Sequence, residues 1–404
     1  MSVKKIKIKF INLFYSFLKP LVKIFFAFLL KVYFKFFPKK RLNHKELRDI
    51  IVIIPPQNGL GDNIMFSYYI DNLAKNNKIN IYIVSPYDSL WKLLDYKNLH
   101  IITCDNNTKS LYRKIINLKQ KFDLAIVPSP YIQHVLILPF LNATYKVCYD
   151  PIDLIIKAKK FKLIGNFTMP NYKEIWFNPY NDFYGNLLKS ALAFCGISVN
   201  EKIPKIKNTN KLSEKLPLNS IIIFVYSKDE LKAVPSFFWI KLCNELINMG
   251  FTPILLYDKQ AREYTKKVAK QIDFEIKLVA TDSIEKTISI LNQAVGCICP
   301  EGGFMHISML SNVPKIAVFS SVVNIEHRIP ISLFSDKTIK AIQVDSEKLR
   351  EYINLISSGY KGFFEYKPAL VKEYINEYKA EVKNIFEREY KKFIDEILKF
   401  LRES

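Results

Sequence analysis

Two glycine-containing turns carry the side chains of this sequence that are best suited to chemistry. The first turn contains Gly59, Gly61 and Asp62 and follows the apolar run 49–55. Glycines allow a ligand to approach the backbone closely, and open α/β sheets bind ligands at the turns that follow their strands. A carboxylate held there can act as a general base, although Asp at a helix start is also a common helix cap. The pattern leaves both roles open for Asp62.

The second turn contains Glu301, Gly302 and Gly303 and opens a predicted helix that includes His306. The apolar run 294–299 before it is typical of a buried strand. A helix that starts at a glycine turn presents unpaired N–H groups and the positive end of its dipole, and these groups bind phosphate. The sequence therefore predicts an anion site here, with an ordinary strand–turn–helix packing unit as the alternative.

A third group of residues lies between the two turns. The apolar run 221–225 leads to Ser227, and Lys232 follows shortly before a predicted helix. A later strand-like run, 253–257, is followed by Glu263. The two glycine turns belong to separate predicted sheets, which suggests a cleft between two halves of the chain.

In this order and spacing, the three groups resemble glycosyltransferase family 9, the heptosyltransferase family of lipopolysaccharide core assembly. The family carries Gly-x-Gly-Asp after its first strand, Lys-x-Trp-Pro before a helix, and Asp-Ser/Thr-Gly-x-x-His late in the chain. The similar segments here are 59–62, 232–235 and 301–306, and the resemblance covers roughly residues 48–330. It implies an α/β fold of the GT-B type, in which two Rossmann-like domains face a central cleft.

The resemblance also implies which residues carry the reaction, the inverting transfer of a sugar from a nucleotide diphosphate. Asp62 would take the proton of the acceptor hydroxyl beside the acceptor-side glycines Gly59 and Gly61, and Lys232 would stabilise the departing phosphate. The donor would be bound by residues of the second half, namely Ser227, Glu263, Glu301, Gly302, Gly303 and His306, the last as an orienting residue and not a base. A surface position for Lys232 and a helix-start position for Glu263 are the simpler alternatives.

Three features depart from the family pattern. Glu301 stands where the family has Asp, Gly302 replaces Ser or Thr, and segment 181–184 lacks the family's His. The longer Glu301 side chain bears on which donor sugar is bound. We expect transfer of heptose or a related sugar from ADP-heptose to a lipopolysaccharide or lipooligosaccharide core acceptor. The alternatives are a UDP-hexose or UDP-N-acetylhexosamine donor, or a catalytically inactive, membrane-anchored protein that binds nucleotide or glycan.

The cysteines and histidines predict neither a metal nor another cofactor. The six cysteines are scattered without a C-x-x-C pair, and the five histidines show no H-x-x-x-H spacing. Cys297 and Cys299 alternate on the predicted buried strand, so we interpret them as small core residues. This use of cysteine fits a reducing cytoplasm.

The net charge of +22 predicts an anionic partner. The sequence contains no zinc-finger spacing, RRM signature or KH loop, so we do not expect nucleic acid to be that partner. Anionic lipid, or an anionic glycolipid acceptor, would be attracted by the same field.

Residues 1–44 combine apolar and aromatic side chains with lysines throughout. The uncharged stretch 24–30 is far shorter than the ~20 apolar residues of a spanning helix, and no cleavage site of a secretory signal follows. One face of a helix over this segment would carry Lys19, Lys23, Lys31 and Lys35. The pattern predicts an amphipathic helix bound peripherally to the inner face of the cytoplasmic membrane. A helix packed on the protein's own core is the alternative.

The rest of the chain is predicted to form two α/β domains, because strand-like and helix-like segments alternate along it. The first domain spans residues 45–200, a linker spans 201–218, and the second domain spans 219–370. A long helix over 371–404 is predicted to pack back on the first domain, with a free amphipathic helix that makes oligomer contacts as the alternative. Strands of the first domain are predicted near 50–54, 80–84, 100–103 and 123–127.

Overall fold

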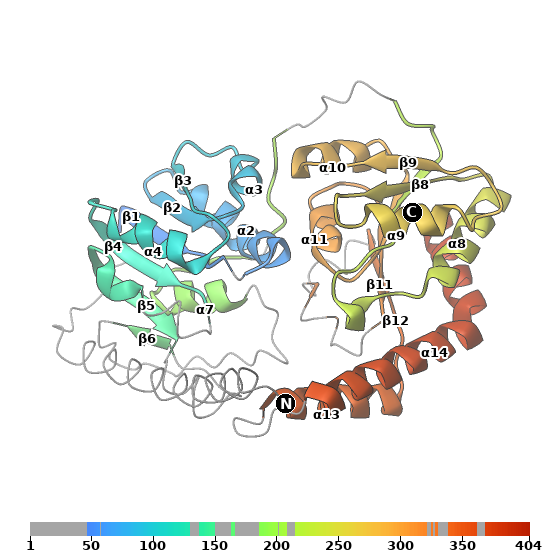
Figure 1. The fold of residues 1–404 in the computed structure, drawn as a ribbon. Coiled ribbons are helices and arrows are strands. Elements are labelled where there is room, and N and C mark those ends of the chain that lie inside the picture. Colours follow the sequence, from blue (N-terminus) through green and yellow to red (C-terminus); the bar gives the residue numbers. More distant parts are fainter. Residues whose placement is uncertain are drawn as a thin grey trace, which may run out of the picture. The chain divides into compact units, whose positions relative to one another are not determined.

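The computed structural model of the 404-residue chain divides into two units, Met1–Pro204 and Lys205–Ser404, and each unit contains one six-stranded sheet (Figure 1). The division falls inside the predicted linker 201–218. The structure describes residues 47–56, 58–129, 137–149, 163–165, 186–200, 202–207, 215–320, 325, 328–329, 338–361 and 368–404. The predicted membrane segment 1–44 and segment 181–184 lie outside these residues.

The sheet of the first unit has the strand order β3-β2-β1-β4-β5-β6. Its strands are β1 (Asp49–Ile53), β2 (Asn80–Ser85), β3 (Leu99–Thr103), β4 (Phe122–Val127), β5 (Ala143–Tyr149) and β6 (Leu163–Gly165). Strands β1 to β5 run parallel, and β6 is antiparallel to β5. Residues 50–53 of β1 are fully buried, as expected for an unbroken apolar strand that is covered on both faces. The four strands predicted in this unit are confirmed.

The helices of the first unit connect these strands. They are α2 (Leu60–Ala74), α3 (Asp88–Lys92), α4 (Thr108–Ile116), the 3₁₀ helix η2 (Leu138–Phe140) and α7 (Asn186–Phe194). Helix α2 starts directly after Gly59, so its first turn carries Asp62 to the carboxyl end of β1.

The sheet of the second unit has the strand order β12-β11-β10-β7-β8-β9, and its described strand pairs are all parallel. The strands are β7 (Ser220–Ile223), β8 (Thr252–Tyr257), β9 (Lys277–Ala280), β10 (Gly296–Pro300), β11 (Lys315–Phe319) and β12 (Ile339–Gln343). The helices are η3 (Glu230–Lys232), α8 (Ser236–Asn248), α9 (Arg262–Ala269), α10 (Ile284–Leu291), α11 (Gly303–Met309), α13 (Glu347–Lys361) and α14 (Pro368–Glu403). Cys297 and Cys299 are buried in β10, which confirms their interpretation as core residues.

Both sheets have the same connectivity. In each, the third strand lies at one edge and the fourth pairs with the other side of the first, so β1 lies next to β4 and β7 next to β10. Open α/β sheets bind ligands outside the carboxyl ends of their strands at such a reversal of strand order. Turn 59–62 follows β1 and turn 301–303 follows β10. Each sheet therefore has one predicted site turn at this position.

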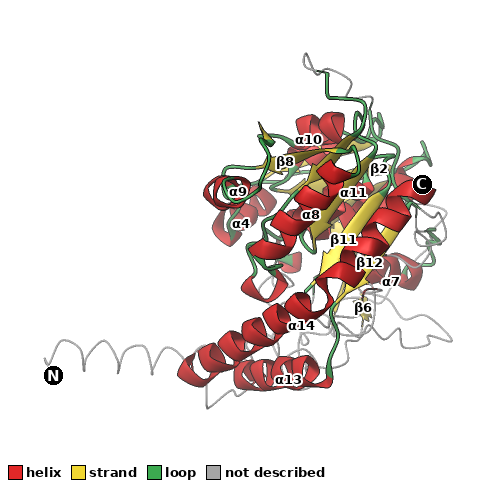
Figure 2. Cartoon of the chain, turned by 90° about the vertical axis from the view of Figure 1, so that its right-hand side faces the viewer, coloured by secondary structure: helices red, strands yellow, loops and turns green. Residues whose placement is uncertain are grey.

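Helix α14 packs within the second unit over its described residues. Its apolar face joins the core that contains α8, and the rings of Phe386 and Phe238 meet edge to face at 5.0 Å between centroids. Figure 2 shows α14 running beside α13. The buried positions of α14 are Tyr378, Val382, Ile385, Phe386, Phe393, Ile394, Ile397 and Leu398. Contact of this helix with the first unit stays a prediction.

Among the described helices, none combines the length and the apolar character that a membrane span requires. Residues 1–44 are not among these helices, so their predicted membrane association stays a prediction.

Candidate functional site

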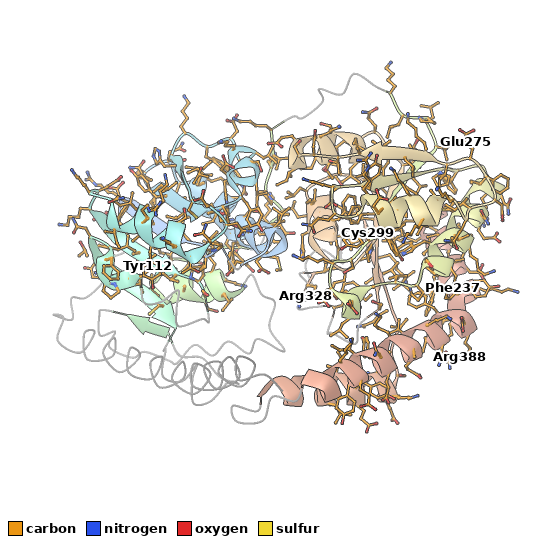
Figure 3. The ribbon with its side chains drawn as sticks, viewed as in Figure 1. Tyr112, Phe237, Glu275, Cys299, Arg328 and Arg388 are labelled. Carbon is orange, nitrogen blue, oxygen red and sulfur yellow. The ribbon has the colours of Figure 1, made fainter. Side chains whose placement is uncertain are left out.

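Glu301 is the buried centre of the site in the second unit. It follows β10, its side chain is 1% exposed, and its Oε1 lies 2.8 Å from Lys232 Nζ and 3.0 Å from Arg328 Nε. Arg328, which is labelled in Figure 3, was not among the site residues predicted from the sequence. Removing a carboxylate from water is costly unless cations pair with it, and here two cations do so. The three ionised side chains together carry a surplus of positive charge.

Lys232 is held by a short, capped turn. It ends the 3₁₀ helix η3, and Asp229 caps this helix by accepting a hydrogen bond from the Leu231 N–H at 3.1 Å. Ser227 Oγ donates to the Asp229 carbonyl oxygen at 3.2 Å. Ser227, which was predicted to bind the nucleotide-sugar donor, therefore supports the turn that carries Lys232.

The glycines after Glu301 leave the backbone accessible. Gly302 has a φ of +156°, a conformation that side chains rarely allow, and α11 starts at Gly303. A Cβ atom added to either glycine would meet no atom of another described residue within 4 Å, apart from its chain neighbours. Gly302 is thus required by its backbone conformation, whereas Gly303 is not, and the space beside both is open to a ligand.

His306 lies in α11 and is buried behind these glycines. Burial first, and then the charges of Arg328 and Lys232, lower the pKa of its imidazole to about 3. Its Nδ1 has no hydrogen-bond partner among the described residues. The imidazole is therefore neutral near pH 7. These observations fit an orienting role better than that of a base, and the role itself stays a prediction.

Glu263 makes no ion pair with Lys232 or Arg328, the cations beside Glu301, among the described residues. It occupies the first turn of α9, after β8, and its side chain is 80% exposed and 4.0 Å from Lys266. Strand β8 pairs with β7, so α9 begins at the same edge of the sheet as the Ser227 loop. The predicted contact of Glu263 with a ribose stays a prediction.

Asp62 caps α2 from its third position. Gly59 is the N-cap residue, and its N–H donates to Asp62 Oδ2 at 2.9 Å, so the carboxylate satisfies one of the unpaired donors of the helix start. Burial raises the pKa of the Tyr87 phenol, and the charge of Asp62 raises it further, which places this phenol near the carboxylate. The capping role of Asp62 is confirmed, and its role as a base stays a prediction.

A buried hydrogen-bond network fixes the turn that precedes Asp62. Asn63 Nδ2 donates to the Gly59 carbonyl at 2.9 Å and to the Asn58 carbonyl at 3.4 Å. Ser85, at the end of β2, donates to Asn63 Oδ1 at 2.8 Å and accepts the Tyr87 N–H at 3.1 Å. The neighbouring strand thus holds the turn in place. The sequence signal for this network was the polar residue Asn63, directly before the apolar run 64–66 of α2.

The sequence of the second unit identifies the kind of protein to which this site belongs. Residues 197–347 match glycosyltransferase family 9 (heptosyltransferase). The match spans Lys232, Glu263, Glu301 and His306 and confirms the resemblance predicted from the motifs. This region of the chain is thus similar to a heptosyltransferase-family glycosyltransferase, over less than half of the chain. No curated protein matches the chain in sequence.

Solved structures of heptosyltransferases and related proteins resemble the chain in fold. A glycosyl transferase family 9 protein from Veillonella parvula has a TM-score of 0.56 at 16% identity, covering 85% of this chain and 98% of its own. The E. coli heptosyltransferase WaaC with ADP has a TM-score of 0.52 at 11% identity, covering 78% and 99%. E. coli ADP-heptose lps heptosyltransferase II has a TM-score of 0.52 at 14% identity, covering 83% and 99%. The chain has their α/β fold with two mainly parallel sheets.

Within the family 9 region, the structure brings together part of the predicted site. Lys232 and Glu301 are in contact, His306 lies within reach of the charge of Lys232, and Ser227 supports the Lys232 turn. Arg328 was missed because it lies beyond the quoted motifs. Within the described ranges, no group of three His, Cys, Asp or Glu side chains is placed to hold a metal ion.

Proposed function

We propose that this protein is an inverting glycosyltransferase that moves heptose, or a related sugar, from ADP-heptose to a lipopolysaccharide or lipooligosaccharide core acceptor. The observation that supports it most directly is the surplus of positive charge beside the open glycine turn after β10. The family match over 197–347 supports the reaction class, and the similarity to E. coli WaaC with ADP supports the nucleotide.

In the proposed reaction, the acceptor hydroxyl attacks the anomeric carbon of the donor sugar while the bond from this carbon to the diphosphate oxygen breaks. The electron pair of that bond leaves with the diphosphate. Lys232 and the N–H groups of Gly302 and Gly303 stabilise the negative charge that develops there. Because Glu301 already holds the Lys232 ammonium, the cation is in position before the donor arrives. These roles require no metal ion and no cofactor.

Asp62 takes the proton of the acceptor hydroxyl in this proposal. The carboxylate accepts the Gly59 N–H at 2.9 Å at the start of α2, at the carboxyl end of β1 where open α/β sheets bind ligands. Among the described residues beyond its chain neighbours, none has an atom within 4 Å of a Cβ built on Gly59, which supports room for an acceptor beside the carboxylate. The proposal requires turns 59–62 and 301–303 to face one central cleft, as in the GT-B type.

The proposed place of reaction is the inner face of the cytoplasmic membrane, where the protein binds peripherally. Support comes from the net charge of +22 and from the lysines and aromatic residues of segment 1–44. An anionic glycolipid acceptor would lie in the same surface and be attracted by the same charge.

The experiment that tests the function is transfer from a panel of nucleotide sugars to a core acceptor, followed by mass spectrometry of the product. We expect transfer from ADP-heptose and thermal stabilisation of the protein by ADP-heptose and ADP. Because Glu301 stands where the family has Asp, a different donor sugar is the second candidate. Transfer from a UDP-hexose or UDP-N-acetylhexosamine alone would replace the proposed donor. Binding without transfer from any donor would instead indicate an inactive binding protein.

A further inference from the structure

Arg328 is the cation of the site to which neither the motifs nor the family match gives a role. It follows β11 in sequence and is labelled in Figure 3. Its Nε lies 3.0 Å from the Glu301 carboxylate. Its side chain is 29% exposed, whereas Glu301 is 1% exposed. The guanidinium therefore extends from a buried partner to solvent.

The charges of the cluster exceed what Glu301 needs. Lys232 alone, at 2.8 Å, would pair the carboxylate, yet Arg328 is also in contact with it and both cations remain partly exposed. A guanidinium has five N–H donors in a planar fork, and a contact through Nε leaves its two terminal amino groups. Among the residues that the structure describes, Glu301 is the one acidic side chain paired with Arg328.

On its buried side, the cluster has no further described acid that would balance this positive charge. The His306 imidazole, which is 5% exposed, is held neutral by burial and by Arg328 and Lys232. No second carboxylate among the described residues pairs with either cation. Next to the cluster, a Cβ on Gly302 or Gly303 would meet no atom of the non-neighbouring residues that the structure describes within 4 Å. The excess charge thus lies beside open space, where an anion can reach it.

We propose that Arg328 is a second phosphate-binding residue of the donor site, in which Glu301 orients the guanidinium through Nε and the terminal amino groups bind the diphosphate. This inference rests on the proposed function, since it names the group that binds the diphosphate together with Lys232. Planar guanidinium groups suit phosphate because they donate two parallel hydrogen bonds. Lys232 and Arg328 both pair with the buried carboxylate, so both cations are in position before the diphosphate arrives.

A competing explanation gives Arg328 no contact with the ligand and only the task of neutralising Glu301. The two explanations differ when Glu301 is itself made neutral. In a Glu301→Gln background, an arginine that only pairs with the carboxylate has lost its purpose, and its removal changes little. An arginine that binds phosphate remains necessary in that background. A double-mutant cycle on the two positions therefore separates the explanations.

The experiment is calorimetric binding of ADP, UDP and inorganic pyrophosphate to the full chain. We compare wild type, Arg328→Gln, Glu301→Gln and the double variant. For Arg328→Gln, we expect roughly ten- to hundred-fold weaker binding of the preferred nucleoside diphosphate, with a loss of similar size in the Glu301→Gln background. Arg388→Gln is the matched control, because Arg388 is an exposed arginine of the same unit and its replacement changes the net charge equally. Arg328→Lys keeps the charge and guards against misfolding, and we expect an intermediate affinity.

Unchanged binding in Arg328→Gln, or a loss that disappears in the Glu301→Gln background, overturns the inference and leaves the proposed function intact. A loss of equal size in Arg388→Gln also overturns it, because the effect is then one of overall charge. A wild-type protein that binds none of the three ligands contradicts the proposed function itself, and the inference with it.

Discussion

Tyr378 of helix α14 donates a hydrogen bond from its hydroxyl to the backbone carbonyl of Ser320 at 2.9 Å. Ser320 Oγ in turn donates to the Leu231 carbonyl at 3.4 Å, one residue before Lys232. Lys379 of the same helix lies 2.8 Å from Glu230. The C-terminal helix thus holds the turn that carries the proposed leaving-group cation, although it is distant in sequence.

We predict that Tyr378→Phe lowers the turnover of sugar transfer more than the affinity for nucleotide. The variant leaves the buried Ser320 carbonyl without its donor, which costs about 1–3 kcal/mol of stability and loosens the Lys232 turn. Steady-state kinetics and urea unfolding measure the two effects. Tyr390→Phe is the control on the same helix, since the Tyr390 hydroxyl makes no hydrogen bond to a described residue and its ring faces Lys241. Equal effects in both variants would contradict the inference that the Tyr378 hydroxyl holds the Lys232 turn in place.

Asp62→Asn should lower transfer by about 10²–10⁴-fold and leave ADP binding within a few-fold, because the base acts on the acceptor. The amide oxygen of the new side chain can still accept the Gly59 N–H, so the start of α2 should keep its cap and the fold its stability. Asp88→Asn is the control, since Asp88 also lies in the first turn of a helix, α3, which follows strand β2 of the first unit. Wild-type turnover in the Asp62→Asn variant would show that the carboxylate only caps the helix.

The sheets and the two glycine turns were predictable because their signals are local. Unbroken apolar runs such as 50–53 indicate buried parallel strands. A glycine turn between such a run and a helix indicates the carboxyl end of a strand, where ligands bind. The pairing of Lys232 with Glu301 also followed in part, since the motifs place both residues in the same half. Their direct contact at 2.8 Å could not be derived from either motif.

Other features depend on contacts that no local pattern encodes. Arg328 follows β11 but pairs with Glu301, which follows β10. Ser85, at the end of β2, donates a hydrogen bond to Asn63 of α2. Only the folded sheet brings each of these pairs together. For α14, the helical period shows which side is apolar but not which surface covers it. The described residues pack that side on α8.

Deleting residues 1–40 should move the protein from the membrane fraction to the soluble fraction. The deletion removes the lysines and aromatic residues proposed to bind anionic lipid, and it ends before the first described strand, β1. Sedimentation with vesicles of anionic or neutral lipid measures the change, and far-UV circular dichroism checks the fold. A shortened protein that still sediments with anionic vesicles would locate the membrane contact elsewhere in the chain.

Gly303→Val should weaken nucleotide binding sharply with little change in thermal stability. The added side chain enters open space beside the turn, where we place the diphosphate, and the φ of Gly303 does not itself require glycine. Gly59→Ala is the control, because the added Cβ also enters space that is open among the described residues, but in the first unit. We expect this variant to bind ADP with unchanged affinity. Calorimetry with ADP measures both. Undiminished affinity in Gly303→Val would mean that the glycine turn serves only packing.

The stability of the protein should fall with acid in part through His306. The pKa of this imidazole is about 3 in the folded protein and about 6.5 in the unfolded chain, so below pH 6.5 protons bind the unfolded chain first and favour unfolding. Its contribution is complete above pH 6.5 and is lost as the pH falls toward 3. Between pH 7 and pH 5, the free energy of unfolding of wild type should therefore fall by about 2 kcal/mol more than that of His306→Gln. Urea unfolding at both pH values measures this difference, and His100→Gln, at an exposed histidine of the first unit, is the control. Parallel pH dependence in wild type and His306→Gln would show that the imidazole is not held neutral beside Lys232 and Arg328.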